Sequence, residues 1–223
     1  MRTLSFFCIT LCLVSPFIGL AQTPKEEVID LGAGVKIDLV LIPAGQFVMG
    51  SAPSEPGHSP NEIQHEVILT KPFFMGKYEV TQSQWEAIMG NNPSSGDKGP
   101  MLPVIDVSWN DCQQFCAKTK LRLPTEAEWE YACRAGTQTA YFSGKDTSKL
   151  GEYAWFDKNA GGHPQPVAQK QPNPWGLYDM CGNLWQWCND FYQVDYYDQS
   201  PQESPRGPKA GDTKVVRGGC WKS

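Results

Sequence analysis

The sequence has little charge, and positive charge is the scarcer sign. Charged residues make up 19% of the 223 residues, and 24 acidic side chains outnumber 19 lysines and arginines, giving a net charge of -5. Surfaces that bind nucleic acids or anionic membranes need clustered positive charge. The composition therefore argues against both kinds of partner, and we expect no nucleic acid partner.

Long hydrophobic runs are also scarce. Residues 4–20 are mainly apolar, but Pro16 interrupts them and they fall short of the ~20 residues that a membrane span requires. No later run is as apolar or as long. We therefore expect no membrane span in the mature chain.

The first residues have the features of a secretory signal. Arg2 provides a positive start, and Gly19 and Ala21 provide the small residues of a cleavage site after the apolar run. We predict that residues 1–21 are a signal peptide and that the mature chain begins at Gln22. The protein would then be exported to the periplasm, the cell surface or the medium; an N-terminal membrane anchor is the alternative.

The cysteines and histidines lack the spacing of a zinc site. Eight cysteines include a C-x3-C and a C-x6-C pair but no CxxC, and the three histidines stand apart from them (Cys112 and Cys116, Cys181 and Cys188, His58, His65 and His163). We expect His58 and His65 to be solvated. Export favours disulfides, but the spacing does not fix their pairing. For Cys116 and Cys133 a bridge, a buried thiol and a redox role all stay open.

Common catalytic patterns are absent as well. The sequence has no Ser-His-Asp order, no phosphate-binding loop and no HExxH, and Glu126 and Glu128 are better explained as residues of a helix cap. We assign no catalytic residue.

What the sequence does contain is many turn formers and a mixture of helix and strand signals. There are 21 glycines and 18 prolines, and three segments begin with a capping signature, at Thr81, Ser108 and Thr125. Strands are predicted by apolar, β-branched runs that end at turn residues; these are residues 37–42 and 46–49, expected to form a hairpin, and residues 66–70, 73–80 and 214–217.

These signals do not alternate as βαβ units, so we predict a single irregular, loop-rich α+β domain with short helices and small antiparallel sheets. Its expected bounds are residues 36–223, after a linker at residues 22–35.

Residues 173–188 combine three tryptophans, two glycines and several oxygen-bearing side chains. A turn of this kind can direct carbonyl and carboxylate oxygens at one hard cation such as Ca²⁺. The alternative is a packed aromatic turn whose Asp and Asn side chains bond their own backbone.

Several blocks in order resemble the formylglycine-generating enzyme (sulfatase-modifying factor) family. The blocks are IPAGQFVMGS (42–51), YEVTQ (78–82), PV (103–104), VSW (107–109), RLPTEAEWEYACR (122–134), GLYDMCGNLWQW (176–187) and VRGG (216–219). The resemblance covers roughly residues 38–221 and implies a fold related to C-type lectins. It also implies an activity, the O2- and copper-dependent oxidation of a sulfatase cysteine to formylglycine.

The reactive cysteines of the active family members have no counterparts in this sequence. The first would follow the Gly-Gly pair by four residues, where Ser223 stands, and the second lies beyond this sequence. The family's closing segment is missing too, including the partners that the resemblance implies for Cys116 and Cys133. These differences indicate a fragment or a truncated product, and copper is not expected because a hydroxyl is a poor ligand for the soft ion Cu(I).

The family's calcium ligands transfer onto this sequence unevenly. One ion would be held by the side chains of Asp179 and Gln186 and by the carbonyls of Gly182 and Leu184. A second would begin at Asn159 and the carbonyl of Ala160. We predict that calcium is the cofactor and that Asp179 is its strongest ligand, since it alone carries a full negative charge.

Two functions follow from the resemblance. The first, which we favour, is an exported binding or structural module without oxidase chemistry. The alternative is a truncated or fragmentary formylglycine-generating oxidase that acts on sulfatases. The expected partner is a sulfatase or another exported protein.

Overall fold

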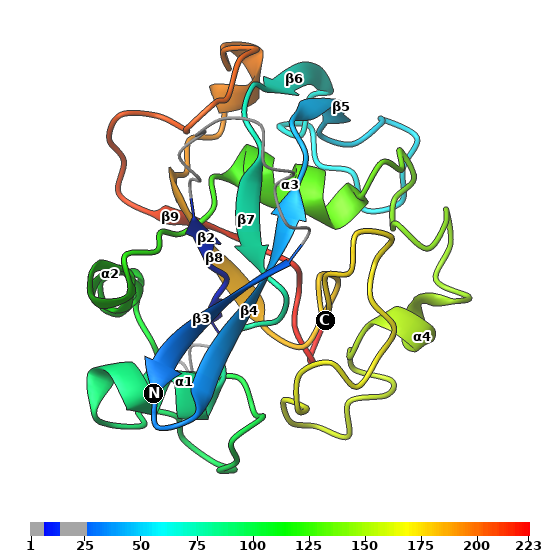
Figure 1. Ribbon diagram of the computed structural model, residues 1–223. Coiled ribbons are helices and arrows are strands. Elements are labelled where there is room, and N and C mark those ends of the chain that lie inside the picture. The colour runs from blue at the N-terminus through cyan, green and yellow to red at the C-terminus, as the bar shows by residue number, and fades with distance from the viewer. Residues whose placement is uncertain (1–6, 14–25) are drawn as a thin grey trace.

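The computed structural model describes residues 7–13 and 26–223. Short strands lie at the centre, helices flank them, and a wide region of loops carrying α4 lies on one side (Figure 1). The strands are β1 (Phe7–Ile9), β2 (Cys12–Leu13), β3 (Glu26–Gly32), β4 (Val35–Ile42), β5 (Gly45–Met49), β6 (His65–Leu69), β7 (Phe73–Gly76), β8 (Trp185–Phe191) and β9 (Lys214–Arg217). The helices are α1 (Gln82–Met89), α2 (Trp109–Thr119), α3 (Glu126–Arg134), α4 (Leu150–Tyr153) and a 3-10 turn (Tyr196–Asp198).

The strands of the described residues form three small sheets. Their orders are β2-β7-β4-β3, β1-β8-β9 and β5-β6, and all neighbours are antiparallel except β1 and β8. The predicted α+β class is therefore confirmed. The predicted hairpin is wrong, because β4 pairs with β3 and β7 while β5 pairs with β6.

Part of the predicted linker is a strand. Glu26–Gly32 runs antiparallel to β4, with Glu26 opposite Val40 and a bulge between Asp30 and Gly32. Its side chains alternate between exposed and half-buried, so the segment has the period of an edge strand. Charges at its start and end made it resemble a linker in the sequence.

Residues 7–13 also belong to the fold, although we predicted them to be part of a signal peptide; most of that peptide lies outside the described residues. The backbone of Cys12 exchanges two hydrogen bonds with Arg122, and Gly76 donates to the carbonyl of Leu11 at 2.7 Å. Leu11 and Cys12 are buried. Cleavage at Ala21 remains a prediction, and it would remove these two strands.

The three predicted helix starts are confirmed. Thr81, Ser108 and Thr125 each accept a hydrogen bond from the backbone amide three residues on, and that residue's side chain accepts from the cap's own amide. Each reciprocal pair satisfies two amides that the first turn would otherwise leave unbonded.

None of the helices in residues 7–13 and 26–223 has the length and apolar character of a membrane span.

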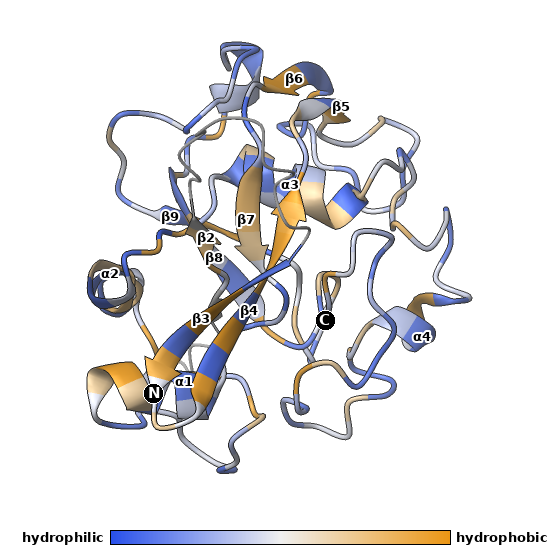
Figure 2. Cartoon of the chain, viewed as in Figure 1, coloured by the Kyte–Doolittle hydropathy of each residue, from blue (hydrophilic) through white to orange (hydrophobic). Residues whose placement is uncertain are grey.

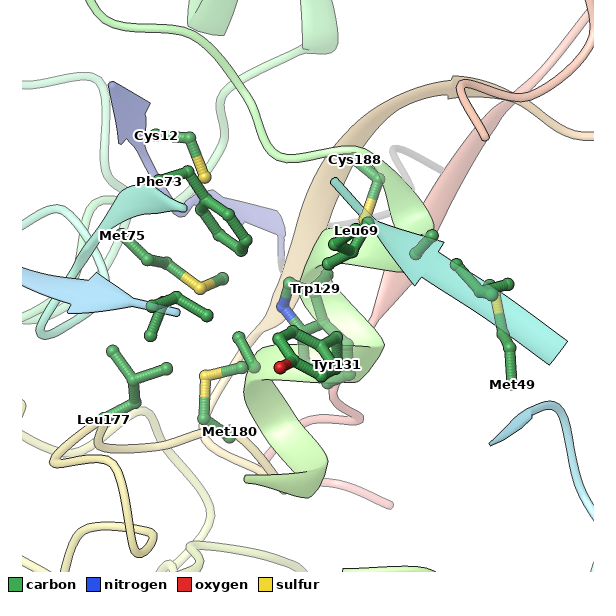
Figure 3. Close-up of a cluster of buried hydrophobic side chains, with 14 of the residues drawn as sticks. Cys12, Met49, Leu69, Phe73, Met75, Trp129, Tyr131, Leu177, Met180 and Cys188 are labelled. Atoms are coloured by element: carbon green, nitrogen blue, oxygen red, sulfur yellow. The ribbon is translucent and has the colours of Figure 1, made fainter. Parts of the chain in front are cut away.

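One part of the core lies between the central strands and α3, and another lies between those strands and helices α1 and α2. Figure 2 shows hydrophobic colour on much of β4 and β7 and paler or hydrophilic colour over the loops around α4. In the close-up of Figure 3, Trp129 and Tyr131 of α3 lie among Phe73, Met75 and Met180. This packing fixes α3, and the opposite face of α3 carries the polar side chains of the site.

Candidate functional site

A cavity of about 390 Å³ lies against α3 and β9. The loops that complete it are residues 50–62, 139–142 and 180–185. Its lining is aromatic and charged, with Trp129, Tyr141, Phe142, Trp185, Tyr197, Glu55, Glu62, Glu130, Arg134 and Arg217 among the residues. This combination suits a ligand that has both an apolar part and hydrogen-bonding groups.

Helix α3 aligns the polar groups of this wall. Glu126, Glu130 and Arg134 are spaced four residues apart, so they project from one face of the helix. Arg134 donates from Nε to Glu130 at 2.8 Å and from Nη2 to the carbonyl of Gly50 at 2.8 Å. Gly50 N–H donates to Glu130 at 3.0 Å, so the helix and the start of the 50–62 loop are held together.

Arg217 joins β9 to the same face of α3. Its guanidinium donates to Glu130 at 2.6 Å and to Glu126 at 3.1 Å, and the Tyr197 hydroxyl donates to Glu126 at 3.0 Å. Burial raises the pKa of Glu126, and the charge of Arg217 opposes that rise. Burial by itself would lower the pKa of Arg217, but the carboxylates of Glu130 and Glu126 raise it well above its ordinary value. The positive charge of Arg217 thus lies between the carboxyl groups of Glu126 and Glu130.

The 50–62 loop carries a second polar cluster at the cavity wall. Ser51 Oγ donates to Glu62 at 2.6 Å and lies 2.7 Å from Nδ1 of His58. The ring of His65 packs on that of Tyr197 at 4.7 Å. Both histidines are half-buried, so solvent reaches them only in part. The carboxylate of this cluster bonds the serine, not the histidine, so the cluster is not a catalytic triad.

One oxygen of the predicted first calcium site, Oδ1 of Asp179, is suited to bind a cation. Asp179 is buried with a φ of 57°, Oδ2 accepts from the amide of Ala168 at 3.0 Å, and Oδ1 has no hydrogen-bond partner. Burial raises the pKa of Asp179 to about 6. An unpaired, buried carboxylate oxygen is what a cation would stabilise.

Gln186, the other predicted side-chain ligand, is less suited. The amide oxygen of Gln186 already accepts from Trp129 Nε1 at 2.8 Å and from Thr10, while its nitrogen donates to the Asp179 carbonyl at 3.1 Å. At the two predicted carbonyl ligands, the Leu184 N–H donates to Glu79, and a Cβ at Gly182 would lie 2.3 Å from the Trp155 carbonyl oxygen; neither contact involves the carbonyl that would bind calcium. Calcium at this place stays a prediction that depends on Asp179.

The predicted second calcium site uses its oxygens within its own loop. Asn159 Oδ1 accepts from the Phe156 amide at 2.8 Å, and the Ala160 carbonyl accepts from Gln165 at 2.8 Å. In the described residues no group of three or more His, Cys, Asp or Glu side chains is placed to hold a metal ion. This second site also stays a prediction.

Ser223 lies in a turn beside Cys220. Ser223 N–H donates to the Cys220 carbonyl at 2.9 Å, Ser223 Oγ accepts from the Cys220 amide at 3.0 Å, and Oγ donates to Sγ at 3.6 Å. Strand alternation would place these residues on opposite faces if the segment were extended. The segment is not extended, because β9 ends at Arg217 and a turn follows, so this alternation does not apply.

Two features of the site were missed in the sequence. Glu128 is the cap residue that we expected and pairs with Arg122, but Glu126 bonds Arg217 across 91 residues. Cys133 and Cys181 lie with their sulfurs 4.0 Å apart in the cavity wall. The four-residue spacing on α3 was a signal in the sequence for the role of Glu126. The sequence offers no signal for the contact of Cys133 with Cys181.

The family model described as "Sulfatase-modifying factor enzyme 1-like domain" matches residues 33–223. A mouse protein named formylglycine-generating enzyme is 40% identical over 174 residues, covering 71% of this chain and 45% of its own length. A Chlamydia caviae protein named serine/threonine-protein kinase pkn1 is 34% identical over 214 residues, covering 83% of this chain. The chain spans only 33% of the length of that relative.

Two solved structures have the same fold. "Treponema denticola variable protein 1" matches with a TM-score of 0.80 and 28% identity, covering 90% of this chain and 89% of its own. The structure of PvdO from Pseudomonas aeruginosa matches with a TM-score of 0.77 and 27% identity, covering 90% of this chain and 88% of its own. The irregular, loop-rich α+β architecture is thus shared across these proteins.

Proposed function

The chain belongs to the sulfatase-modifying factor enzyme 1-like family, and on that basis we propose that it is an exported binding module without cysteine-oxidase activity. The observation that carries the proposal is the pair formed by Ser223 and Cys220. Ser223 stands where the active members of the family are expected to have the first reactive cysteine.

The chemistry of the expected oxidation requires two thiolates that hold Cu(I). The turn at residues 220–223 offers one thiol, Cys220, which is 5% exposed, and one hydroxyl, whose oxygen is a hard donor. The hydroxyl of Ser223 cannot supply the first of these soft ligands. The single thiol is also engaged, because the Ser223 hydroxyl and the Lys222 amide donate to its sulfur at 3.6 Å and 3.4 Å.

The cavity supports the binding part of the proposal. Its volume of about 390 Å³ is in the range of small-ligand clefts, ~300–1,000 Å³. Glu130 is already paired with Arg217 and Arg134, so an incoming charge would gain little from these three groups. The aromatic wall is the stronger source of affinity. We propose that the ligand is a peptide segment of an exported partner that inserts an apolar side chain.

Two measurements on one peptide test the proposal. A sulfatase-derived cysteine peptide is incubated with the chain, copper, O2 and reductant and then analysed by mass spectrometry; we expect an unmodified thiol. Conversion of the thiol to an aldehyde would overturn the proposal and support the alternative, a formylglycine-generating oxidase.

Binding is measured separately by calorimetry with the same peptide and with other exported peptides. Phe142→Ala removes an aromatic ring from the cavity wall and should weaken binding about 10-fold. Val194→Ala is the matched control, since Val194 is 61% exposed and is not among the cavity residues. Equal affinity of both variants would show that the cavity is not the binding site.

A further inference from the structure

Cys133 and Cys181 form an unassigned pair of thiols in the wall of the cavity. Cys133 is the penultimate residue of α3, and Cys181 lies in the loop that leads to β8. Both side chains are half-buried, both line the cavity, and their Sγ atoms are 4.0 Å apart. Both cysteines therefore border the space that a small molecule in the cavity would occupy.

The backbones on both sides of the pair are already held in place. The Asn173 side chain donates to the carbonyls of Ala132 and Cys133 at 2.7 and 3.2 Å, which ties the end of α3 to the loop. Cys133 Sγ also donates to the Met180 carbonyl at 3.7 Å. A disulfide needs the sulfurs about 2 Å closer together.

The other cysteines are in different environments. The other cysteines with described side chains are all buried (Cys12, Cys112, Cys116, Cys188 and Cys220), and no second pair of cysteines among the described residues is joined by a hydrogen bond between sulfurs. Burial raises the pKa of Cys116 to about 12, which suppresses its reactive thiolate form. Oxidation is therefore expected to select the cavity pair.

We propose that Cys133 and Cys181 form a reversible disulfide that links α3 to the loop before β8. The oxidant is a low-molecular-weight disulfide, RSSR. The Cys133 thiolate attacks one sulfur of RSSR, forming a mixed disulfide and releasing one RS⁻, which is protonated. Cys181, as thiolate, then attacks Sγ of Cys133 and releases the second RS⁻. In total two protein thiols lose two hydrogens and two electrons, and RSSR becomes two RSH.

A hydrogen bond with Cys133, together with burial, raises the pKa of the Cys181 thiol well above its ordinary value. Attack on RSSR by either thiol first gives the same Cys133–Cys181 disulfide. This pairing differs from the one that the family resemblance implies for Cys133, whose partner there lies in the closing segment.

The test uses the full chain, purified under reducing conditions and then equilibrated with oxidised glutathione. Thiols are counted in denaturant before and after, and the oxidised protein is mapped by mass spectrometry without reduction. We expect the loss of two thiols and a linked peptide pair that contains Cys133 and Cys181. An unchanged thiol count, or a bridge between other cysteines, would overturn the proposal.

Single-cysteine variants provide the second part of the test. Cys133→Ser and Cys181→Ser should each abolish the loss of two thiols, whereas Cys220→Ser, which changes a cysteine of another turn, should retain it. Oxidation should also raise the melting temperature of the parent by about 5–10 °C. A Cys133→Ser chain that still loses two thiols would contradict the pairing. The mass-spectrometric map of the oxidised parent chain decides whether Cys133 and Cys181 are paired, even if a variant fails to fold.

Discussion

Arg217 on β9 donates from Nη2 to Oε2 of Glu130 on α3 at 2.6 Å, although 87 residues separate the two in the chain. Glu130 is 3% exposed and is bonded at the same time by Arg134 and by the Gly50 amide. One carboxylate thus connects a strand, a helix and a loop around the cavity. Such a carboxylate is costly to remove, because its two arginine partners would remain without their common counter-charge.

Glu130→Gln should therefore destabilise the protein by about 3 kcal/mol. Glu26→Gln, which breaks the exposed pair with Lys77, should cost less than about 1 kcal/mol and is the matched control. Unfolding in urea measures both free energies. If the two variants had the same midpoint, the Arg217–Glu130 pair would not contribute to stability as described.

Asp190 should make stability depend on pH. Burial and the nearby Glu126 raise its pKa to about 7, and it accepts a hydrogen bond from the Glu126 amide at 3.1 Å. The pKa of Asp190 in the folded state lies above its unfolded value of about 4. Its favourable contribution to folding stability is therefore complete below pH ~4 and is lost as pH rises through ~7.

Asp190→Asn keeps the hydrogen-bond acceptor and removes the charge. The variant should be about 2–4 kcal/mol more stable than the parent at pH 8 and should show a flatter profile between pH 4 and 8. Thermal unfolding measured between pH 4 and 8 checks this difference in stability, with Asp195→Asn, at an exposed position, as the control. Parallel profiles for Asp190→Asn and the parent would rule out this role for Asp190.

Asp179 should determine any calcium affinity at the 179–186 turn. Asp179→Asn removes the full negative charge next to the unpaired Oδ1 and should weaken calcium binding more than Gln186→Ala does. Calorimetry with calcium chloride on both variants measures this. Without calcium, Asp179→Asn should lose no stability at pH 7, since a buried, uncompensated charge is removed. Equal calcium affinity of Asp179→Asn and the parent would remove the site from consideration.

The fate of residues 7–13 can be measured directly. N-terminal sequencing of the exported product should give Gln22 as the first residue. A chain that begins there lacks the buried Leu11 and Cys12 and the backbone bonds to Arg122, so it should be about 3 kcal/mol less stable than the uncleaved chain. Urea unfolding of the two purified forms compares them. Identical stability would mean that these strands add nothing to the fold.

Local signals made the helices predictable from the sequence. Thr81, Ser108 and Thr125 each lie three residues before the side chain that completes the capping box, so the interaction is contained within four residues. The resemblance of the blocks at 122–134 and 176–187 to a known family was sufficient to indicate the fold. The position of Asp179 in a turn was recognisable in the same way.

Strand partners and the polar site depended on the tertiary structure. Strand β5 pairs with β6 across the 51–61 loop instead of with the adjacent β4, and β8, which we interpreted as a turn, pairs with β9. Arg217 donates hydrogen bonds to Glu126 and Glu130, and the sulfurs of Cys133 and Cys181 are in contact. These interactions join residues that are 48 to 91 positions apart in the chain. Caps and turns are specified by neighbouring residues, and therefore the sequence determined them. The cavity and its paired charges exist only where the packing of α3 on the core brings distant segments together, so the tertiary structure alone decided them.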